Sequence, residues 1–500
     1  MPPSTDSLAP AHQPRAATGI DGLDNVLGGG LPRGHLYLVE GTPGAGKTTL
    51  GLQFLLEGRA RGERGLYVTL SETATELGIV AGSHGWSLDG IELFELVNEE
   101  GLSASSEQSI LYPAEVELGE TTRGVMTAVE RLSPSRLVFD SLSEMRLLAQ
   151  DPLRYRRQIL ALKHFFATRD CTVLMLDDMS SAGGDLQLHS IAHGVLGLDQ
   201  ATGDYGPVRR HLRIVKMRGV RYRGGEHDVN LDTGGLQVFP RLIAAEHRTE
   251  FESTSTSTGT QQLDTLLGGG LARGSNTLFI GPSGVGKTTT AISAVVAALK
   301  RGEKASYYLF DEGLGTLLHR CSALGLPLQP YIDSGQLEVL PLDPAEVSPG
   351  QFSNMVRRAV QQRGAGVIVI DSLNAYLQAM PGAKFLLLQM HELLNFLNQQ
   401  GVVTLLVLGQ HGIIGDVRSD LDLSYLSDAI VLFRFFEARG QLRKAVSVVK
   451  SRTSQHELSI REFRLGPEGV EVGPALTDFE GVLSGVPRYA GGIALLGDKV

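Results

Sequence analysis

The chain has little cysteine and no long apolar run, and both shortages narrow the classes of protein to which it can belong. Its two cysteines, Cys171 and Cys321, lie far apart and lack the spacing of metal ligands. We therefore expect buried free thiols rather than a disulfide framework or a zinc site. No apolar segment approaches the length of a membrane span, and residues 1–17 lack the apolar core of a signal peptide. The sequence predicts a disordered lead over 1–17, no contact with a membrane and a cytoplasmic location.

Basic residues are outnumbered by acidic ones. The sequence holds 45 Lys and Arg residues against 55 Asp and Glu residues, which gives a formal net charge of −10. Because net negative charge opposes general binding to polyanions, we expect no nucleic-acid partner. A length of 500 residues exceeds what one hydrophobic core usually serves. At least two domains are therefore expected.

Glycine is abundant, with 61 residues, and its placement marks an internal repeat. The segment TGIDGLDNVLGGGLPRG (18–34) returns as TGTQQLDTLLGGGLARG (258–274), and GTPGAGKTTL (41–50) returns at the same spacing as GPSGVGKTTT (281–290). Farther along, the matching segments keep their order but not their spacing, as loop insertions in a duplicated domain would cause. The sequence therefore predicts two copies of one domain.

The composition between the copies sets the predicted domain boundaries. HRTEFESTSTS (247–257) is rich in Ser and Thr and has little to bury, so we predict a linker there. The first domain is predicted over residues 18–246 and the second over residues 258–489. A short C-terminal tail is predicted over 490–500.

In both copies, short apolar runs alternate with helical patterns. HLYLVE (35–40) and NTLFI (276–280) each end in a glycine-rich loop that opens a helical stretch, and further apolar runs follow. Such alternation is typical of an α/β domain whose mostly parallel sheet is flanked by helices. Ligands of these sheets bind beyond the carboxyl ends of the strands, which is where the loops are expected.

Both loops fit the pattern G-x-x-x-x-G-K-[ST], which holds the phosphates of a nucleotide. Its glycines let backbone N–H groups face the phosphates, its lysine reaches the β- and γ-oxygens, and the next helix adds the positive end of its dipole. We therefore predict that ATP binds in both copies. The predicted nucleotide-binding residues are Gly41, Thr42, Pro43, Gly44, Ala45, Gly46, Lys47, Thr48 and Thr49 in the first copy and Gly281, Pro282, Ser283, Gly284, Val285, Gly286, Lys287, Thr288 and Thr289 in the second.

The same pattern predicts a Mg²⁺ site in each copy. The hydroxyl of the loop threonine, Thr48 or Thr288, is a ligand of Mg²⁺ in such loops. A second anchor is expected at Asp140, which ends the apolar run RLVFD, and at Asp371, which ends VIVID. The alternative interpretation is a solvated aspartate at the end of a strand.

Hydrolysis of a nucleotide also needs a base that orients the attacking water. Glu72 and Glu312 occupy equivalent places in the repeat, each after the strand that follows the loop helix. In such a fold this place lies close to the nucleotide, so we predict that both glutamates act as bases. The alternative is that each caps the next helix.

The ordered set of LGGGLPRG and LGGGLARG, the two loops, the glutamates, the DSLS and DSLN turns and the KMRG hairpin resembles the KaiC family of circadian-clock ATPases and autokinases. The resemblance covers about residues 18–489 and implies two tandem RecA-like P-loop NTPase domains in a double-ring homo-hexamer, with ATP at the subunit interfaces. It also implies that Lys216 and Arg218, and in the second copy Lys450 and Arg452, reach the γ-phosphate held by a neighbouring subunit. An exposed cationic hairpin is the simpler interpretation of each pair.

The resemblance further implies serine autokinase chemistry in the second copy and a signalling protein as partner. The stretch RSDLDLSYLSDAIVLF places Ser424 at the family's acceptor position with Ser419 nearby, although Tyr425 stands where the family has threonine. Asp311 and Glu312 form the acidic pair typical of the family and are candidates to accept the serine proton. The first copy keeps only one of these two carboxylates.

Two other functions fit part of the pattern. A RecA-like recombinase or repair ATPase would share the loops and the carboxylates, but it should add mobile DNA-binding loops with basic or aromatic residues. The best such stretch is RYRRQILALKH (154–164), which we expect to form the solvated face of a helix. The other alternative is a signalling scaffold that ATP holds together with little turnover.

Overall fold

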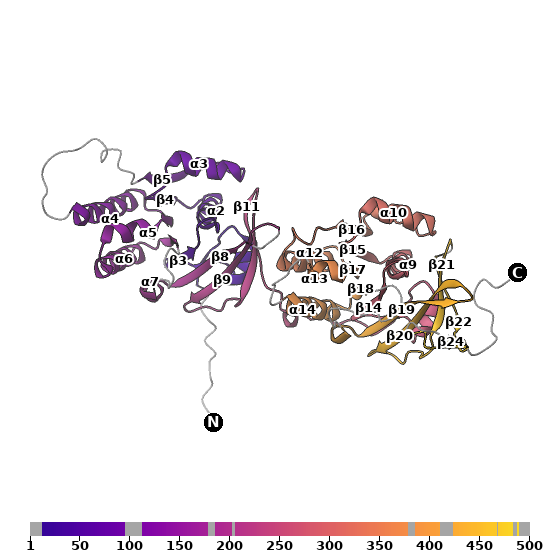
Figure 1. Ribbon diagram of the computed structural model, residues 1–500. Coiled ribbons are helices and arrows are strands. Elements are labelled where there is room, and N and C mark those ends of the chain that lie inside the picture. The colour runs from indigo at the N-terminus through magenta and orange to yellow at the C-terminus, as the bar shows by residue number, and fades with distance from the viewer. Residues whose placement is uncertain are drawn as a thin grey trace, which may run out of the picture. The chain divides into compact units, whose positions relative to one another are not determined.

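The chain folds into two compact units, Met1–Arg241 and Leu242–Val500. The computed structural model describes residues 13–95, 113–178, 186–202, 206–378, 386–410, 424–467, 469–483 and 488–489 (Figure 1). Each unit is a layered α/β domain built on one large sheet.

The first unit opens with a short strand pair and then alternates strands with helices. In chain order its elements are β1 (Arg15–Ala16), α1 (Asp21–Leu27), β2 (Leu31–Pro32), β3 (Leu36–Gly41), α2 (Lys47–Ala60), β4 (Gly65–Thr69), α3 (Ala74–Ser83), β5 (Ile91–Glu95), α4 (Pro113–Leu132), β6 (Arg136–Asp140), α5 (Leu142–Ala149), α6 (Pro152–Ala167), β7 (Thr172–Asp178), α7 (Leu186–Ile191), β8 (Gly194–Ala201), β9 (Arg209–Met217), β10 (Glu226–Asp232) and β11 (Gly235–Phe239).

The second unit repeats this order with small additions. Its elements are η2 (Ala244–His247), β12 (Ser255–Thr256), α8 (Gln261–Leu266), β13 (Leu271–Ala272), β14 (Ser275–Pro282), α9 (Lys287–Lys300), β15 (Lys304–Leu309), α10 (Leu314–Ala323), α11 (Gln329–Asp333), β16 (Leu337–Pro341), α12 (Pro349–Gln361), β17 (Ala365–Asp371), α13 (Leu373–Gln378), α14 (Leu386–Gln399), β18 (Val403–Gln410), η3 (Ser424–Leu426), β19 (Ala429–Ala438), β20 (Gln441–Ser451), β21 (Arg461–Gly466), β22 (Gly469–Ala475), β23 (Phe479–Glu480) and β24 (Arg488–Tyr489).

The two nine-stranded sheets have the same topology. The strand order is β5-β4-β6-β7-β3-β8-β9-β10-β11 in the first unit and β16-β15-β17-β18-β14-β19-β20-β21-β22 in the second. The strands from β5 to β8 pair in parallel, and β8 to β11 pair antiparallel. The second sheet follows the same rule. The predicted fold class, two tandem RecA-like domains with mostly parallel sheets, is confirmed.

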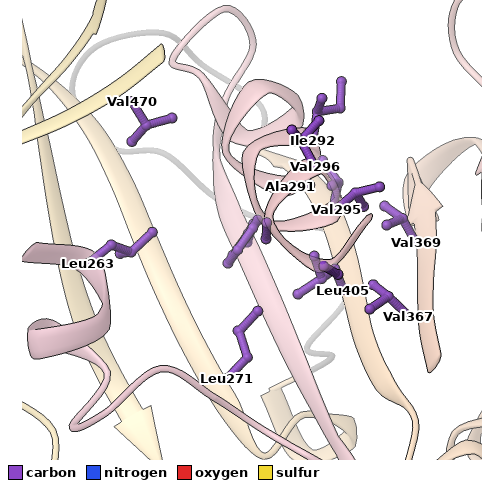
Figure 2. Close-up of a cluster of buried hydrophobic side chains, with 14 of the residues drawn as sticks. Leu263, Leu271, Ala291, Ile292, Val295, Val296, Val367, Val369, Leu405 and Val470 are labelled. Carbon is purple, nitrogen blue, oxygen red and sulfur yellow. The ribbon is translucent and has the colours of Figure 1, made fainter. Parts of the chain in front are cut away.

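Side chains on the central strands point alternately into two buried layers. On β17, Val367 and Val369 join the layer that contains α9, whereas Ile368 and Ile370 join the layer on the opposite face. Figure 2 shows Val367 and Val369 beside Val295 of α9. Because both faces of these strands are covered, the strands read as continuous apolar runs rather than as alternating ones.

The ends of the predicted domains differ in detail from the structural units. Arg15 and Ala16, which we assigned to the lead, form β1 and pair with Leu31 and Pro32 of β2. Residues 1–12 and the predicted tail 490–500 lie outside the described residues. The first unit ends at Arg241 rather than at 246.

The predicted linker 247–257 is part of the second unit. Thr249 donates through Oγ1 to the carbonyl of Gln399, at 3.0 Å. Farther along, β12 pairs antiparallel with β13. The Ser/Thr-rich composition that suggested a linker therefore describes a segment held mainly by hydrogen bonds, with few buried apolar side chains.

Two further expectations are met among the described residues. Cys171 and Cys321 are free and buried. The stretch 154–164 lies in α6, where Tyr155 and Ile159 are among the residues that face the core. Arg154 and Arg157 are exposed, and Lys163 is half-buried. Within the described ranges, no helix is both long and apolar enough to cross a membrane.

Candidate functional site

Each predicted nucleotide loop leaves the carboxyl end of a central strand and opens a helix. Gly41 pairs with Leu198 of β8, and a Cβ at Gly41 would lie 2.1 Å from the Leu198 carbonyl oxygen. At the far end of the loop, Gly46 has φ 104°, a conformation that favours glycine, and α2 begins at Lys47. The glycines of the motif are therefore required by the backbone path as well as by phosphate binding.

The two loop lysines bend back over their own loops. Nζ of Lys47 donates to the carbonyls of Gly41 and Thr42, at 2.8 and 3.0 Å, and forms an ion pair with Asp178 at 2.7 Å. Nζ of Lys287 donates to the carbonyls of Gly281 and Pro282, at 2.9 and 2.8 Å. Both ammonium groups thus lie at the mouth of the loop, where a nucleotide's phosphates are bound in this motif.

The predicted metal ligands lie together in the first unit. Oγ1 of Thr48 donates to Oδ2 of Asp140 at 3.1 Å, and the hydroxyl of Tyr67 donates to the same oxygen at 2.5 Å. Burial raises the pKa of Asp140, and the two hydrogen bonds partly offset this shift. One threonine hydroxyl beside one carboxylate at a phosphate loop is the donor set that suits Mg²⁺, which takes its other ligands from phosphate and water.

The second unit repeats this arrangement. The hydroxyl of Tyr307 donates to Oδ2 of Asp371 at 2.5 Å, and Thr288 hydrogen-bonds the same carboxylate. Burial is again the largest cause of a raised pKa at Asp371. No cluster of three or more His, Cys, Asp and Glu side chains with metal-binding geometry occurs within the described ranges.

Glu72 is held close to Asp140 with one carboxylate oxygen unused. A turn fixes its backbone, because the Glu72 N–H donates to Oγ1 of Thr69 at 2.9 Å. Its Oε2 is buried and has no hydrogen-bond partner among the described residues. Burial, followed by the charge of Asp140, raises the pKa of Glu72. A raised pKa brings a carboxylate closer to the range in which a general base works.

Glu312, its counterpart, is not free in this way. Arg320 of α10 donates through NH2 to Oε1 of Glu312 at 2.5 Å. Burial raises the pKa of Glu312, and Arg320 lowers it as the next largest cause. Asp311, the other member of the predicted acidic pair, is exposed.

The cationic residues near the ends of β9 and β20 lie far from the P-loops of their own units. Lys216 pairs with Val195, near the start of β8, whereas the loop follows Gly41 opposite Leu198 of the same strand. Nζ of Lys216 donates to the carbonyl of Ala192 at 3.0 Å, and Arg218 donates to that of Ser190 at 2.7 Å. A strand rises about 3.3 Å per residue, so the two places are separated by roughly 10 Å or more.

The second unit has the same separation. Lys450 pairs with Ile430 near the start of β19, and its Nζ donates to the carbonyl of Ser427 at 2.7 Å. Arg452 lies 3.8 Å from Oδ1 of Asp428. Neither unit brings these predicted γ-phosphate ligands to its own P-loop.

The predicted phosphoacceptors lie mostly outside the described residues. Ser419 lies outside them altogether, and the backbone of Ser424 begins η3 while its side chain is not described. The next residue, Tyr425, is exposed, and Leu426 is buried. Because η3 precedes β19, it lies at the same end of the sheet as Lys450 and not at the P-loop end.

Sequence reasoning missed several residues that shape these sites. Tyr67 and Tyr307 stand at the same place in the repeat, so their identity in both copies was a signal that could have found them. Asp178 and Arg320 carried no such signal, because neither recurs. Their partners became clear only from the pairing of β3 with β7 and from the position of α10.

Comparison with known proteins bears on both units. The family model for the KaiC-type ATPase domain matches residues 16–243 and again residues 256–477. The chain is 27% identical over 478 residues to circadian clock protein KaiC3 of Synechocystis sp. (strain ATCC 27184 / PCC 6803 / Kazusa), with 94% of each chain covered.

Two further relatives give the same result. The circadian clock oscillator protein KaiC of Parathermosynechococcus lividus is 26% identical over 502 residues, which covers 95% of this chain and 88% of the relative. Circadian clock protein KaiC2 of Synechocystis sp. is also 26% identical, over 499 residues. With two tandem matches to the family model on two units of one topology, this chain belongs to the KaiC family of ATPases.

Proposed function

We propose that this KaiC-family ATPase is a double-ring homo-hexamer that binds and hydrolyses Mg-ATP at the interfaces between subunits of both rings. One observation carries the proposal: in each unit, the P-loop and the cations at the end of β9 or β20 lie at opposite ends of the sheet. Lys216 and Arg218 therefore cannot serve the nucleotide of their own unit. A ring, in which each subunit's hairpin meets the next subunit's P-loop, uses both.

The proposed chemistry assigns a role to each group of residues. Lys47 and Lys287 bind the phosphates, and Glu72 and Glu312 accept a proton from the attacking water. Thr48 with Asp140, and Thr288 with Asp371, hold Mg²⁺, which when bound offsets the negative charge of the phosphates. The cations at the ends of β9 and β20 stabilise the charge that develops on a neighbour's γ-phosphate, a contribution of about 10³–10⁵ in rate for an arginine finger.

Oligomerisation tests this proposal directly. Light scattering of the full chain is expected to show a hexamer with saturating Mg-ATP. The substitutions Lys216→Ala with Arg218→Ala, and Lys450→Ala with Arg452→Ala, should lower turnover more than they lower nucleotide binding. A protein that stays monomeric at saturating Mg-ATP would contradict the assignment of these cations to a neighbour's nucleotide.

We further propose that the second ring is a serine autokinase that modifies Ser424 and, less readily, Ser419. The support is positional: η3 lies at the hairpin end of the sheet, so a neighbour's P-loop can present its γ-phosphate there. The Ser424 hydroxyl attacks the γ-phosphorus, the bond to the ADP oxygen breaks, and the serine proton passes to the neighbour's Asp311 or Glu312 carboxylate.

Mass spectrometry after incubation with Mg-ATP should find phosphate on Ser424, and the substitution Ser424→Ala should remove it. Phosphate-free protein would leave an ATPase without the kinase step.

The phosphorylation state of the second ring is proposed to be the signal that a protein partner reads. Two other functions remain as outcomes of experiment. Salt-dependent binding to single-stranded DNA would favour a recombination ATPase. Turnover that is unchanged by Glu72→Gln and Glu312→Gln together would favour a scaffold that ATP merely holds together.

A further inference from the structure

The first unit contains a small cavity with cationic walls at the end of the sheet opposite its P-loop. His35 precedes β3, His193 precedes β8, Lys163 lies on α6 and Arg218 follows β9, and all four line the cavity. Phe166 of α6 forms part of its apolar wall. We call these four basic residues the cationic pocket.

Two stacked imidazoles form one wall of the cationic pocket. The rings of His35 and His193 lie 3.8 Å apart, at an angle of 10°. Nε2 of His193 is buried and has no hydrogen-bond partner among the described residues. Burial, then the neighbouring His35, lowers the pKa of His193 to about 4, and burial followed by the charge of Lys163 lowers the pKa of His35. Both rings are therefore neutral at pH 7, and Nε2 of His193 is left without a hydrogen bond among the described residues.

The other two residues of the pocket, Lys163 and Arg218, carry positive charge that no carboxylate of the described residues neutralises. Nζ of Lys163 donates to the carbonyl of Ile191 at 2.7 Å, and neither Lys163 nor Arg218 forms an ion pair within the described ranges. Burial and the charge of Arg218 lower the pKa of both Lys163 and Lys216. Asp170 is the acidic group that acts on the pocket, and it acts on His35. The pocket therefore has an excess of positive charge.

At the equivalent place, the second unit has a carboxylate of its own beside its cationic residue. Gly194 pairs with Tyr37 as Ala429 pairs with Thr277, so Asp428 stands where His193 stands. Its Oδ2 accepts from the backbone N–H of Asn276 and from Nδ2 of Asn398, at 3.0 and 3.2 Å. Asp428 also lies beside Arg452. The second unit thus has a built-in carboxylate, and the first unit has a cavity at the equivalent place.

We propose that the cationic pocket of the first unit binds a phosphate oxyanion, with Lys163 and Arg218 as donors and with Nε2 of His193 as a third donor in the tautomer that carries its proton there. A phosphate group carries more charge and more acceptor oxygens than a carboxylate, and it therefore suits a lysine, an arginine and an imidazole together. The group has two sources: a free inorganic anion, or the terminal phosphate of a nucleotide held by a neighbouring copy. The second source rests on the proposed ring; the first does not.

Binding of a free anion is tested with inorganic pyrophosphate. Full-length protein carrying Lys47→Ala and Lys287→Ala, which weakens both P-loops, is titrated by calorimetry at low ionic strength. His193→Asp, which supplies the second unit's carboxylate, and Lys163→Gln should each weaken binding at least about tenfold. The matched control is Arg169→Gln, which removes an exposed cation near the same end of α6 that is paired with Glu130.

The neighbour's nucleotide is tested by mixing subunits that carry Glu312→Gln, so that only the first unit turns over. Lys47→Ala chains keep the cationic pocket, and His193→Asp chains keep the P-loop. If the pocket receives a neighbour's phosphate, the mixture hydrolyses ATP at least a few-fold faster than the average of the two separate proteins. Hydrolysis equal to that average, together with pyrophosphate binding that depends on His193 and Lys163, assigns the pocket to a free anion.

The titration and the mixing experiment also distinguish failure of the cationic pocket from failure of the proposed ATPase function. If the unmodified protein hydrolyses no ATP, the proposed ATPase rings are overturned. The pyrophosphate titration then still decides whether the cationic pocket binds a phosphate oxyanion. The pocket itself is overturned if Lys163→Gln and His193→Asp match Arg169→Gln in the titration and the mixture shows no gain. Equal weakening of binding by Arg169→Gln and Lys163→Gln counts as such a match, because the attraction would then be general.

Discussion

The two units share a sheet topology, a P-loop and a buried strand-end aspartate, yet they surround the predicted base differently. Glu72 keeps a buried carboxylate oxygen without a partner among the described residues, whereas Glu312 is paired with Arg320. At the place of Arg320 in the repeat, the first unit has Val80. Duplication has therefore preserved the position of the predicted base while the neighbouring helix has changed its charge environment.

The loop lysines differ in the same way. Lys47 has the carboxylate of Asp178 as an ion-pair partner, and the equivalent place beside β14 is Gly409. Burial lowers the pKa of Lys287 to about 8, with only partial compensation from Asp371 and Asp311. The first unit therefore combines an ion-paired lysine with an unpaired base, and the second combines a lysine of lowered pKa with a paired base.

The largest effect is expected from removing both bases. Glu72→Gln together with Glu312→Gln should lower ATP turnover by about 10²–10⁴-fold, because a general base contributes that much. Glu72→Gln alone should remove most of the activity if the unpaired glutamate is the better base. ADP release at saturating Mg-ATP measures both.

Folding of the Glu72→Gln protein provides the control. The folded-state pKa of Glu72 is raised, so its ionised form is penalised by folding at pH values above that pKa. Glutamine carries no such penalty, and thermal melting at pH 8 should show an unchanged or higher Tm. Equal losses of activity from the two single substitutions would remove the difference between the units.

The next largest effect is expected from removing the ion pair between Arg320 and Glu312. In a protein carrying Glu72→Gln, Arg320→Val should raise turnover by up to about tenfold, because a freed Glu312 becomes a stronger base by as much as about one pKa unit. Arg320→Lys, which keeps the charge, should gain less. The reciprocal Val80→Arg, in a protein carrying Glu312→Gln, should slow the first unit. A slower Arg320→Val enzyme would mean that Arg320 positions the base instead of restraining it.

A smaller effect follows from Lys287. Phosphate needs the charged lysine, and the neutral fraction of free Lys287 grows as pH rises through about 8. Nucleotide affinity of the second unit should therefore fall by about threefold between pH 7.5 and 8.5, with proton uptake on binding. Calorimetry of a Lys47→Ala protein in two buffers of different ionisation enthalpy measures the uptake. The Lys287→Ala protein keeps only the first site. If its nucleotide affinity showed the same pH dependence, the proposed difference between Lys47 and Lys287 would be contradicted.

The smallest effect concerns the tyrosines on β4 and β15. Tyr67→Phe removes a donor to the ionised carboxylate of Asp140, so the pKa of Asp140 should rise further. The acid limb of the turnover profile should then move to higher pH by less than about one unit. Tyr307→Phe should do the same through Asp371. A shift toward lower pH would show that the tyrosine competes with the metal for the shared oxygen.

Local sequence sufficed for the parts of the site that are continuous in the chain. The P-loop binds through backbone N–H groups of one short segment, so its glycines, Lys47 and Lys287 are readable from spacing. The internal repeat added Asp140 and Glu72 as equivalents of Asp371 and Glu312, because a duplicated domain keeps the order of its strands. The KMRG hairpin at the end of β9 was named from the resemblance, but the antiparallel pairing of β9, β10 and β11 at the margin of the sheet was not predicted, since hairpin pairing leaves a weak signal in such strands.

By itself the sequence determined the two domains, their α/β class and the residues that meet the phosphates, because these depend on periodicity and on contiguous motifs. Only the tertiary structure decided the partners of those residues. The order of the sheet places His193 beside His35 and keeps Lys216 away from Gly41, and α10 brings Arg320 to Glu312. Such contacts join segments that are distant in sequence or that lie on separate elements, and their energies depend on burial and charge that no single segment contains.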